Sequence, residues 1–177
     1  MGIPDEKEYE IRYTTLSDLP SLQSWLSHPE DRFWFPISSE QEAEQMSKNW
    51  IGFYKYGASL TATYKGENLG IATLFLMPYR KVIHHCMIYF IVDPKMRKRG
   101  VGTSLVKNIT HLGKSYFRFE WINAEIWEGC PGHSLLLRQG YQEIVRQEKY
   151  VKTAEGNSLS RLLLQSDCQK EEDGAKS

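Results

Sequence analysis

The sequence lacks the features that mark several large classes of protein. No apolar run reaches the roughly 18 residues that a membrane-spanning helix needs. Lysine plus arginine equals aspartate plus glutamate at 22 each, so the basic excess typical of general nucleic-acid or membrane-surface binders is missing. The three cysteines are an odd number without metal-type spacing, which argues against a disulfide framework. We therefore expect a reduced, cytoplasmic protein with no nucleic-acid partner, no membrane partner and no metal.

Length and composition favour one domain with a substantial core. The chain has 177 residues, of which 41% are hydrophobic. We expect an N-terminal extension at 1–8, whose acidic and polar character is unlike a secretory signal. A single domain at 9–166 follows, and then a polar, disordered tail at 167–177.

Hydrophobic periodicity predicts a mixed α/β fold. Strands are expected at 9–13, 59–64, 69–77, 82–92, 117–127, 141–150 and 159–164. Helices are expected at 19–28, 38–57, 101–112 and 131–139. This order, βααβββαβαββ, predicts a twisted sheet flanked by about four helices, since doubly wound folds alternate strands and helices more regularly. The 82–92 segment is almost continuously apolar, so we expect a central strand buried on both faces.

The most informative segment is the turn that follows this strand. It reads Val-Asp-Pro-Lys-Met-Arg-Lys-Arg-Gly-Val-Gly-Thr-Ser over 92–104. Two glycines and four cations in one strand-to-helix turn suit a backbone that comes close to a phosphate. A Walker loop needs a lysine directly after Gly102, which this sequence lacks, and a dinucleotide fingerprint needs a third glycine, which it also lacks. The segment instead contains an Arg-x-x-Gly-x-Gly motif, which would direct backbone N–H groups toward an anion. The alternative is a basic, solvent-exposed connection that binds nothing.

With this motif the chain resembles the GNAT superfamily of acetyl-CoA-dependent N-acetyltransferases. The pyrophosphate-binding signature of that family is matched at Val92, Pro94, Arg97, Gly100 and Gly102. The order of elements agrees over roughly 9–165. The segment Glu-Gly-Cys-Pro at 128–131 and the pair Gly-Tyr at 140–141 look like a later motif of the family, and the aromatic loop at 33–36 is similar to the ribosomal-protein and polyamine acetyltransferase branch.

The resemblance implies a GNAT-type fold with a central, mostly antiparallel sheet that splits beside Val92 to admit the cofactor. It implies acetyl-CoA as cosubstrate, with its pantetheine arm on the backbone near Val92. It implies that the pyrophosphate is bound by Arg97, Lys98, Arg99, Gly100, Val101, Gly102 and Thr103. It further implies direct transfer to a primary amine of a small molecule or a protein, and it is compatible with a homodimer.

The catalytic groups are less plainly marked. Leu136 occupies the position where family members commonly have a proton-donating tyrosine, so another group or water protonates the thiolate, or the thiolate leaves unprotonated. Glu125 is the first candidate for general base, because some family members place a catalytic glutamate on this strand. His84 is the second, because a histidine pKa suits base chemistry. A surface carboxylate and a structural histidine are the alternatives, and Cys86 is expected to be a small buried residue.

The acceptor and the function class stay open at this stage. Carboxylates near the aromatic loop favour a cationic acceptor, with ordinary helix-start acids as the alternative: Glu30, Asp31, Glu40, Glu42 and Glu44. Besides an enzyme, the same turn would serve a non-catalytic acyl-CoA-binding module. It would also serve a nucleotide-binding protein.

Overall fold

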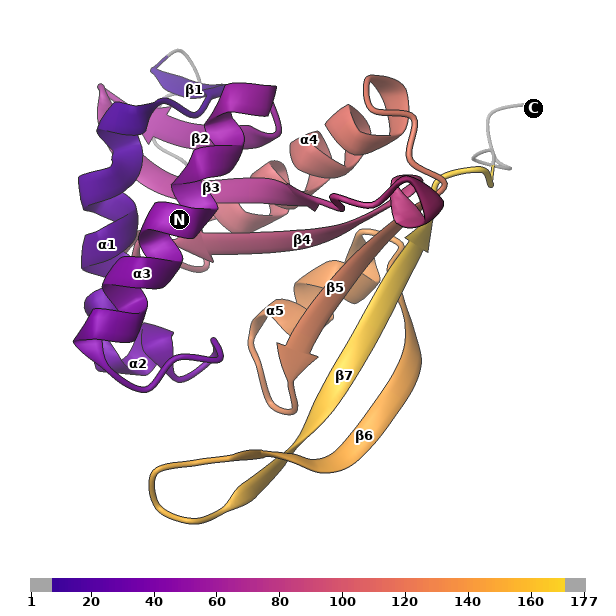
Figure 1. The fold of residues 1–177 in the computed structure, drawn as a ribbon. Helices are drawn as coiled ribbons and strands as arrows, with labels where there is room; N and C mark the ends of the chain where they lie inside the picture. The colour runs from indigo at the N-terminus through magenta and orange to yellow at the C-terminus, as the bar shows by residue number, and fades with distance from the viewer. Residues whose placement is uncertain (1–7, 171–177) are drawn as a thin grey trace.

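The computed structural model describes residues 8–170, which build one seven-stranded sheet with helices on both faces (Figure 1). The strand order is β1-β2-β3-β4-β5-β7-β6, and all neighbours are antiparallel except β4 and β5, which are parallel. The strands are β1 (Tyr9–Tyr13), β2 (Ser59–Tyr64), β3 (Glu67–Leu76), β4 (His85–Val92), β5 (Trp121–Trp127), β6 (Gln142–Lys152) and β7 (Ser158–Asp167).

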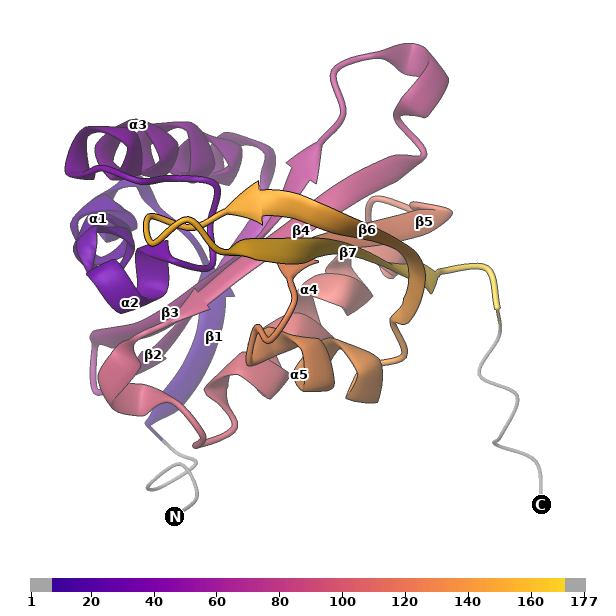
Figure 2. The ribbon, with the colours of Figure 1, turned by 90° about the horizontal axis from the view of Figure 1, so that it is seen from below.

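The helices form two layers. On one face of the sheet lie α1 (Leu19–Ser27), α2 (Pro29–Arg32) and α3 (Glu40–Ile51), and on the other lie α4 (Val101–Ser115) and α5 (Gly132–Arg138), as Figure 2 shows. Four short 3₁₀ segments add single turns at Leu16–Asp18, Gly52–Tyr56, Arg80–Val82 and Pro94–Met96. The predicted mixed α/β sheet with flanking helices is thus confirmed, although residues 8–170 contain five α-helices and not four.

A separate hydrophobic layer lies on each face. Between the sheet and α1 and α3, the fully buried Leu22, Leu26 and Trp50 pack on Ile71 and Ile91. On the other face, the apolar stripe of α4 packs on inward residues of β3, β4 and β5; its buried members are Val101, Leu105, Val106 and Ile109. The 3.6-residue periodicity of these helices therefore corresponds to real core faces.

Several predicted boundaries move for local reasons. The turn between β2 and β3 is only Lys65 and Gly66, both with positive φ, which suits a two-residue hairpin. β4 begins at His85, because 80–82 forms a 3₁₀ turn instead of strand. Phe117 and Phe119 stack on each other at 5.5 Å before β5 begins, so this apolar stretch packs as a loop.

Two further expectations are corrected. α2 lies where we expected only a helix stop at Pro29, because Pro29 opens a second short helix after His28 adopts an extended conformation. β4 is only partly buried on its two faces: Cys86, Ile88 and Ile91 are buried, whereas Tyr89 and Phe90 are half-buried.

The predicted extension (1–8) and tail (167–177) lie mostly outside the described residues. Where the structure does describe the tail, it continues the fold. Asp167 ends β7, and the next residue, Cys168, is buried and donates its backbone N–H to the carbonyl of Glu120 at 2.9 Å.

Candidate active site

The turn between β4 and α4 is shaped by two residues with positive φ. Lys98 has φ of 59° and Gly100 of 87°, and Gly100 is the residue that precedes α4. A Cβ at Gly100 would meet nothing within 4 Å, so the backbone angle and not lack of space requires glycine there. The first N–H groups of α4 have no acceptor within the helix, and the helix dipole adds partial positive charge. The turn therefore presents backbone donors to an anion.

Next to this turn, β4 and β5 part. Their parallel pairing runs from His85 opposite Trp121 to Ile88 opposite Ala124 and stops there. Beyond that point β4 pairs only with β3, and β5 pairs only with β7. The backbone of β4 from 89 to 92 thus has polar groups that face the gap without a strand partner. The split that the family resemblance implied is confirmed.

A cavity of about 480 Å³ fills the gap and runs from the turn along β4. Its walls come from β4, β5, α5, the turn with the start of α4, and α2 with the segment that follows it. They include Asp31, Phe35, Tyr89, Val92, Arg97, Gly102, Glu125 and Leu136. The cavity therefore joins the anion-binding turn to the gap between the strands.

Two glycines keep the walls of this cavity close together. A Cβ at Gly102 would lie 2.9 Å from Cδ1 of Leu135 and 3.5 Å from Cγ2 of Val92. A Cβ at Gly132 would lie 3.1 Å from the tip of the Phe90 ring. Any side chain at Gly102, in the first turn of α4, would therefore have to displace the Leu135 side chain of α5.

Most of the residues expected to hold the cofactor lie in the cavity wall. These are Val92, Arg97, Lys98, Gly100, Gly102 and Thr103. Arg99 and Val101 are not part of this wall. The Val101 side chain is 1% exposed and points into the core, so Val101 has only its backbone to offer a ligand.

Arg97 connects the turn to α2. Its Nη2 atom donates to Oδ1 of Asp31, a side chain that is 1% exposed, while Arg97 itself is 40% exposed. The other oxygen, Oδ2, is buried and has no hydrogen-bond partner among the described residues. Partial burial lowers the pKa of Arg97, although a guanidinium stays charged at any physiological pH. The pair fixes one end of the cavity to the helical layer above it.

Glu125 lies in the wall on the side of β5, as expected for a candidate base. Its side chain is 15% exposed, and its Oε2 accepts a hydrogen bond from Nε of Arg161 at 2.6 Å and also pairs with Nη2 of Arg161. Both contacts use Oε2, and no described residue donates to Oε1. Arg161 is held in turn by Oε1 of Gln147 at 2.7 Å and lies over the ring of Tyr150 at 4.9 Å. Glu125 is therefore a positioned carboxylate with one free oxygen.

Tyr89 lies near this carboxylate in the sheet. Because Ile88 is paired with Ala124, Tyr89 and Glu125 follow on the same face at the point where the strands part. Burial raises the pKa of Tyr89 to about 12, and the charge of Glu125 adds to this shift. The side chain is therefore a neutral hydroxyl near pH 7, able to donate a proton.

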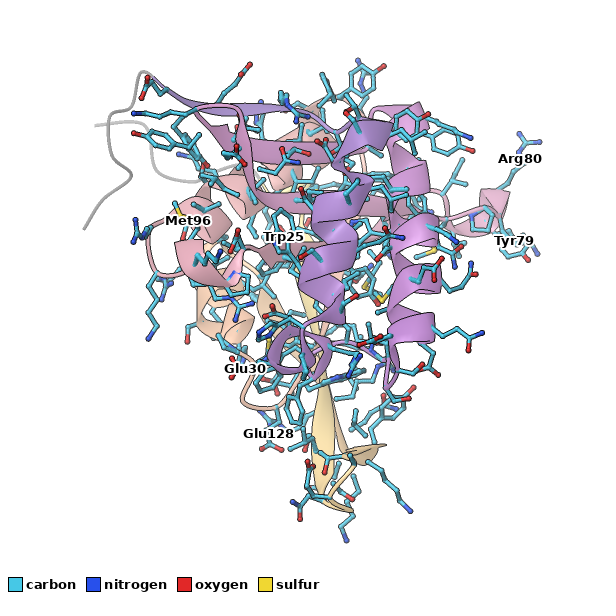
Figure 3. All side chains as sticks on the ribbon, turned by 90° about the vertical axis from the view of Figure 1, so that its left-hand side faces the viewer. Trp25, Glu30, Tyr79, Arg80, Met96 and Glu128 are labelled. Carbon is cyan, nitrogen blue, oxygen red and sulfur yellow. The ribbon has the colours of Figure 1, made fainter. Side chains whose placement is uncertain are left out.

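His84 lies far from the cavity. It precedes β4, at the end of the strand opposite to Val92, and eight residues of strand separate the two by roughly 25 Å. Figure 3 shows Tyr79 and Arg80 at the tip of the connection that leads to this end, on the opposite side from Met96 of the anion-binding turn. His84 is absent from the cavity wall, and its ring packs at 4.2 Å from that of His85. The structure therefore does not bring His84 together with Glu125.

Three of the five acidic residues near the aromatic loop have partners inside the chain. Asp31 pairs with Arg97, and Glu44 pairs with Lys48 at 2.6 Å. Oε2 of Glu42 accepts hydrogen bonds from the backbone N–H groups of Ser38 and Ser39 at the start of α3, which lowers the pKa of Glu42. These three carboxylates thus fulfil structural roles at helix ends and between elements.

Comparison with known proteins agrees with this geometry. The model of the acetyltransferase (GNAT) family matches residues 10–128, which include the whole anion-binding turn and β5. The chain belongs to the GNAT family. It is therefore an enzyme of the N-acetyltransferase class, and acetyl-CoA is the cosubstrate of this fold. No protein with a curated description matches the chain in sequence.

Solved structures support the GNAT fold at low sequence identity. A GCN5-related N-acetyltransferase from Kribbella flavida superposes with a TM-score of 0.79 at 17% identity, covering 92% of this chain and 99% of that one. A ribosomal-protein-alanine N-acetyltransferase from Brucella melitensis gives 0.73 at 21%, covering 89% and 99%. A protein from Salmonella typhimurium named as an acetyltransferase, solved with its cofactor acetyl-CoA, gives 0.76 at 12%, covering 93% and 96%.

In this GNAT enzyme, Leu136 and the cysteines offer no acid–base chemistry. Leu136 is fully buried and contributes an apolar surface to the cavity. Cys86 is fully buried, and burial raises the pKa of its thiol, so it is a packing residue as expected. Cys130 lies in the cavity wall, and burial raises the pKa of this thiol too, which keeps it protonated.

Sequence reasoning gave no site role to several residues of the cavity wall. Asp31 was noticed only as an acid and Phe35 only as part of an aromatic loop, and Tyr89 was not singled out at all. Tyr89 does carry a signal: it is the polar aromatic residue in the apolar strand that leads to the motif. No local signal places Asp31 or Phe35 beside the turn, because α2 lies more than 60 residues earlier in the chain.

Within residues 8–170, no group of three or more histidine, cysteine, aspartate or glutamate side chains could hold a metal ion. None of the helices in that range is long and apolar enough to span a bilayer.

Proposed function

We propose that this enzyme transfers the acetyl group of acetyl-CoA directly to a primary amine of a small molecule or a peptide. One observation carries the proposal: a single cavity joins the anion-binding turn to the gap between β4 and β5, where Glu125 and Tyr89 meet. A simple anion site would need only the turn. A group-transfer site needs the gap as well.

The residues present fit acetyl-CoA along its whole reactive half. The N–H groups at the start of α4 would receive the pyrophosphate, and Lys98 and Arg97 would add positive charge. The unpaired backbone edge of β4 at 89–92 would bind the amides of the pantetheine arm as a strand partner would. The cosubstrate supplies an activated acyl group, a thioester, at the far end of this path.

The side chains around the gap would manage the protons. Oε1 of Glu125 would take a proton from the substrate ammonium, directly or through water, which leaves a neutral amine. The nitrogen then forms a bond to the carbonyl carbon, the C–S bond breaks, and the hydroxyl of Tyr89 would protonate the departing sulfur. The nitrogen then loses its remaining extra proton, which would return through water to the Tyr89 phenolate, and Glu125 would release its own proton to solvent. The net products are an acetamide, coenzyme A and one proton.

The direct test is release of coenzyme A thiol by the purified protein with acetyl-CoA and a panel of primary amines. We expect coenzyme A thiol to be released only when an amine is present, and we expect mass spectrometry to detect the acetylated amine. Tight acetyl-CoA binding without release for any amine would instead indicate a non-catalytic acyl-CoA-binding module. Thermal stabilisation by ATP or NAD equal to that by acetyl-CoA would indicate a nucleotide-binding protein.

A cytoplasmic location is part of the same proposal. All three cysteines, Cys86, Cys130 and Cys168, are free thiols, which suits a reducing compartment. Cell fractionation with an antibody to the protein tests it, and recovery in an oxidising compartment would contradict it.

A further inference from the structure

A second, mostly apolar groove lies between α3 and the sheet. It has a volume of about 580 Å³ and shares Tyr89 with the wall of the cavity described above. Its aromatic residues are Phe53, Phe75 and Tyr89, with the fully buried Trp50 behind them. Ring centroids in this group are 4.6 to 6.0 Å apart, so the rings form one continuous cluster.

Tyr89 belongs to the walls of both cavities. Phe35, in the wall of the first cavity, lies 6.4 Å from Tyr89 and 5.7 Å from Trp50, so the two walls are continuous. Glu125 follows Tyr89 on the same face of the sheet. A molecule whose apolar part occupied the groove could therefore reach past Tyr89 and place a polar group beside Glu125, the proposed base.

The groove offers an ammonium group little charge. Glu42 is its one carboxylate among the described residues, and Oε2 of Glu42 already caps α3. The other polar members, Gln45 and Asn49, bond to each other at 3.1 Å across one turn of α3. Met46 and Ile37 complete the wall with flexible apolar surface. This is the lining expected around an apolar group, and a polycation would find no row of free carboxylates here.

We infer that the acceptor is a primary arylalkylamine whose aromatic group enters this groove while its nitrogen lies beside Glu125. The inference rests on the proposed acetyltransferase function and names its substrate class. It differs from the polycationic acceptor that the acidic residues suggested, since Asp31, Glu42 and Glu44 are engaged within the chain.

The experiment compares 2-phenylethylamine, ethylamine and spermidine as acceptors in the thiol-release assay, with wild type and Met46→Glu. We expect kcat/KM for 2-phenylethylamine to exceed that of the other two amines by about 10-fold or more, because only 2-phenylethylamine can bury a phenyl ring in the groove, and buried apolar groups favour the substrate that carries them. Met46→Glu should raise KM for 2-phenylethylamine by about 10-fold with little change for ethylamine. Gln41→Glu, an exposed residue of α3 outside the groove, adds the same charge and should change neither.

Binding of 2-phenylethylamine to the protein saturated with coenzyme A, followed by calorimetry, separates this inference from the proposed function. Binding that Met46→Glu weakens, without any turnover, would support the groove and overturn the transferase proposal. Turnover that favours spermidine, or a KM for 2-phenylethylamine that Met46→Glu leaves unchanged, would overturn the groove and leave the transferase. If Met46→Glu does not fold, the neutral Met46→Gln should still raise this KM about 3-fold, and an unchanged value again contradicts the inference.

Discussion

At the scale of single residues, the account depends on how a carboxylate and a phenol are placed where β4 and β5 part. Glu125 was proposed from sequence because the family resemblance places a catalytic glutamate on this strand, and the structure puts it on the face opposite to the buried Ala124 and Ile126. Tyr89 is visible in the sequence as a polar aromatic residue of an apolar strand, but only the pairing of Ile88 with Ala124 sets its position beside Glu125. The two residues thus show what local pattern can and cannot predict.

Replacing Glu125 with glutamine should lower kcat by about 100-fold, the lower end of what a general base contributes. The amide oxygen can still accept from Arg161, so acetyl-CoA affinity should stay unchanged. Steady-state kinetics and calorimetry measure the two quantities. Glu128→Gln is the matched control, since that exposed carboxylate pairs with Arg146 at 3.3 Å and is not part of the cavity wall. A wild-type kcat in Glu125→Gln would exclude the role.

Replacing Tyr89 with phenylalanine should lower kcat about 10-fold while the KM of the amine stays the same. The ring remains as a wall of both cavities, and only the proton donor is lost. Because the pKa of Tyr89 is about 12, the phenol keeps its proton up to roughly pH 11, so its loss should not limit wild-type kcat between pH 7 and 10. Equal kcat for both proteins would show that water, or no group, protonates the sulfur.

At the scale of elements, α3 begins where its capping residue Ser39 places it. Ser39 accepts a hydrogen bond from the N–H of Glu42 at 3.1 Å, and Glu42 bonds back to the N–H of Ser39. This reciprocal pair agrees with the helix that the sequence predicted from residue 38 onward. α3 in turn provides one wall of the apolar groove.

Ser39→Ala should therefore lower the free energy of unfolding by about 1 kcal/mol, the usual cost of a lost N-cap. Urea denaturation followed by circular dichroism measures it. In Ser38→Ala, which removes only an exposed hydroxyl that bonds to Glu42, we expect a smaller loss. Equal losses in the two variants would show that the Ser39 cap has no special role.

Sequence patterns located the longer elements well and the short ones poorly. Strong periodicity predicted all seven strands and four of the five helices that residues 8–170 contain. The four-residue α2 has no periodicity to detect, and a proline that can end one helix also suits the first turn of the next. His84 was placed on a strand because its neighbours are apolar, but Val82 and Ile83 are 41% and 53% exposed and precede β4.

At the scale of the whole molecule, a buried aspartate joins the first three strands on the side away from the gap. Asp18 is 2% exposed and accepts hydrogen bonds from Arg12, Thr61 and Asn68, which lie on β1, β2 and β3. Burial alone would raise the pKa of Asp18, but the bonds from Arg12, the N–H of Thr15 and Thr61 outweigh it and lower the pKa to about 2. The ionised form therefore stabilises the folded state.

This network makes the free energy of unfolding depend on pH between about 4 and 2. A pKa lower in the folded than in the unfolded chain contributes stability above about pH 4, and that stability is lost as the pH falls toward 2. The shift corresponds to about 2 kcal/mol. Urea unfolding at pH 7 and pH 3 measures it: Asp18→Asn should lose stability at pH 7 and show less further loss at pH 3 than wild type. Parallel losses in the two proteins would contradict this assignment.

The helical layers of the whole fold meet at one place. The layer of α1–α3 and the layer of α4 and α5 lie on opposite faces of the sheet (Figure 2). Arg97 and Asp31 connect them beside the cavity, and the parting of β4 and β5 opens the sheet at that point. Under the proposed function, the donor would bind at the start of α4 and the acceptor would approach from the face covered by α1–α3. No local pattern predicts it, since it needs contacts between segments 66 residues apart.

The central claim is that the start of α4 receives the pyrophosphate of acetyl-CoA. The most direct test is calorimetric measurement of the Kd for acetyl-CoA with wild type and with Gly102→Glu, which introduces bulk against Leu135 and a negative charge at the N–H groups. Asn108→Glu, with the same charge on the exposed side of α4, is the control. We expect Gly102→Glu to lose at least about 100-fold in affinity, or about 3 kcal/mol, and Asn108→Glu to match wild type. Wild-type affinity in a folded Gly102→Glu variant would contradict it.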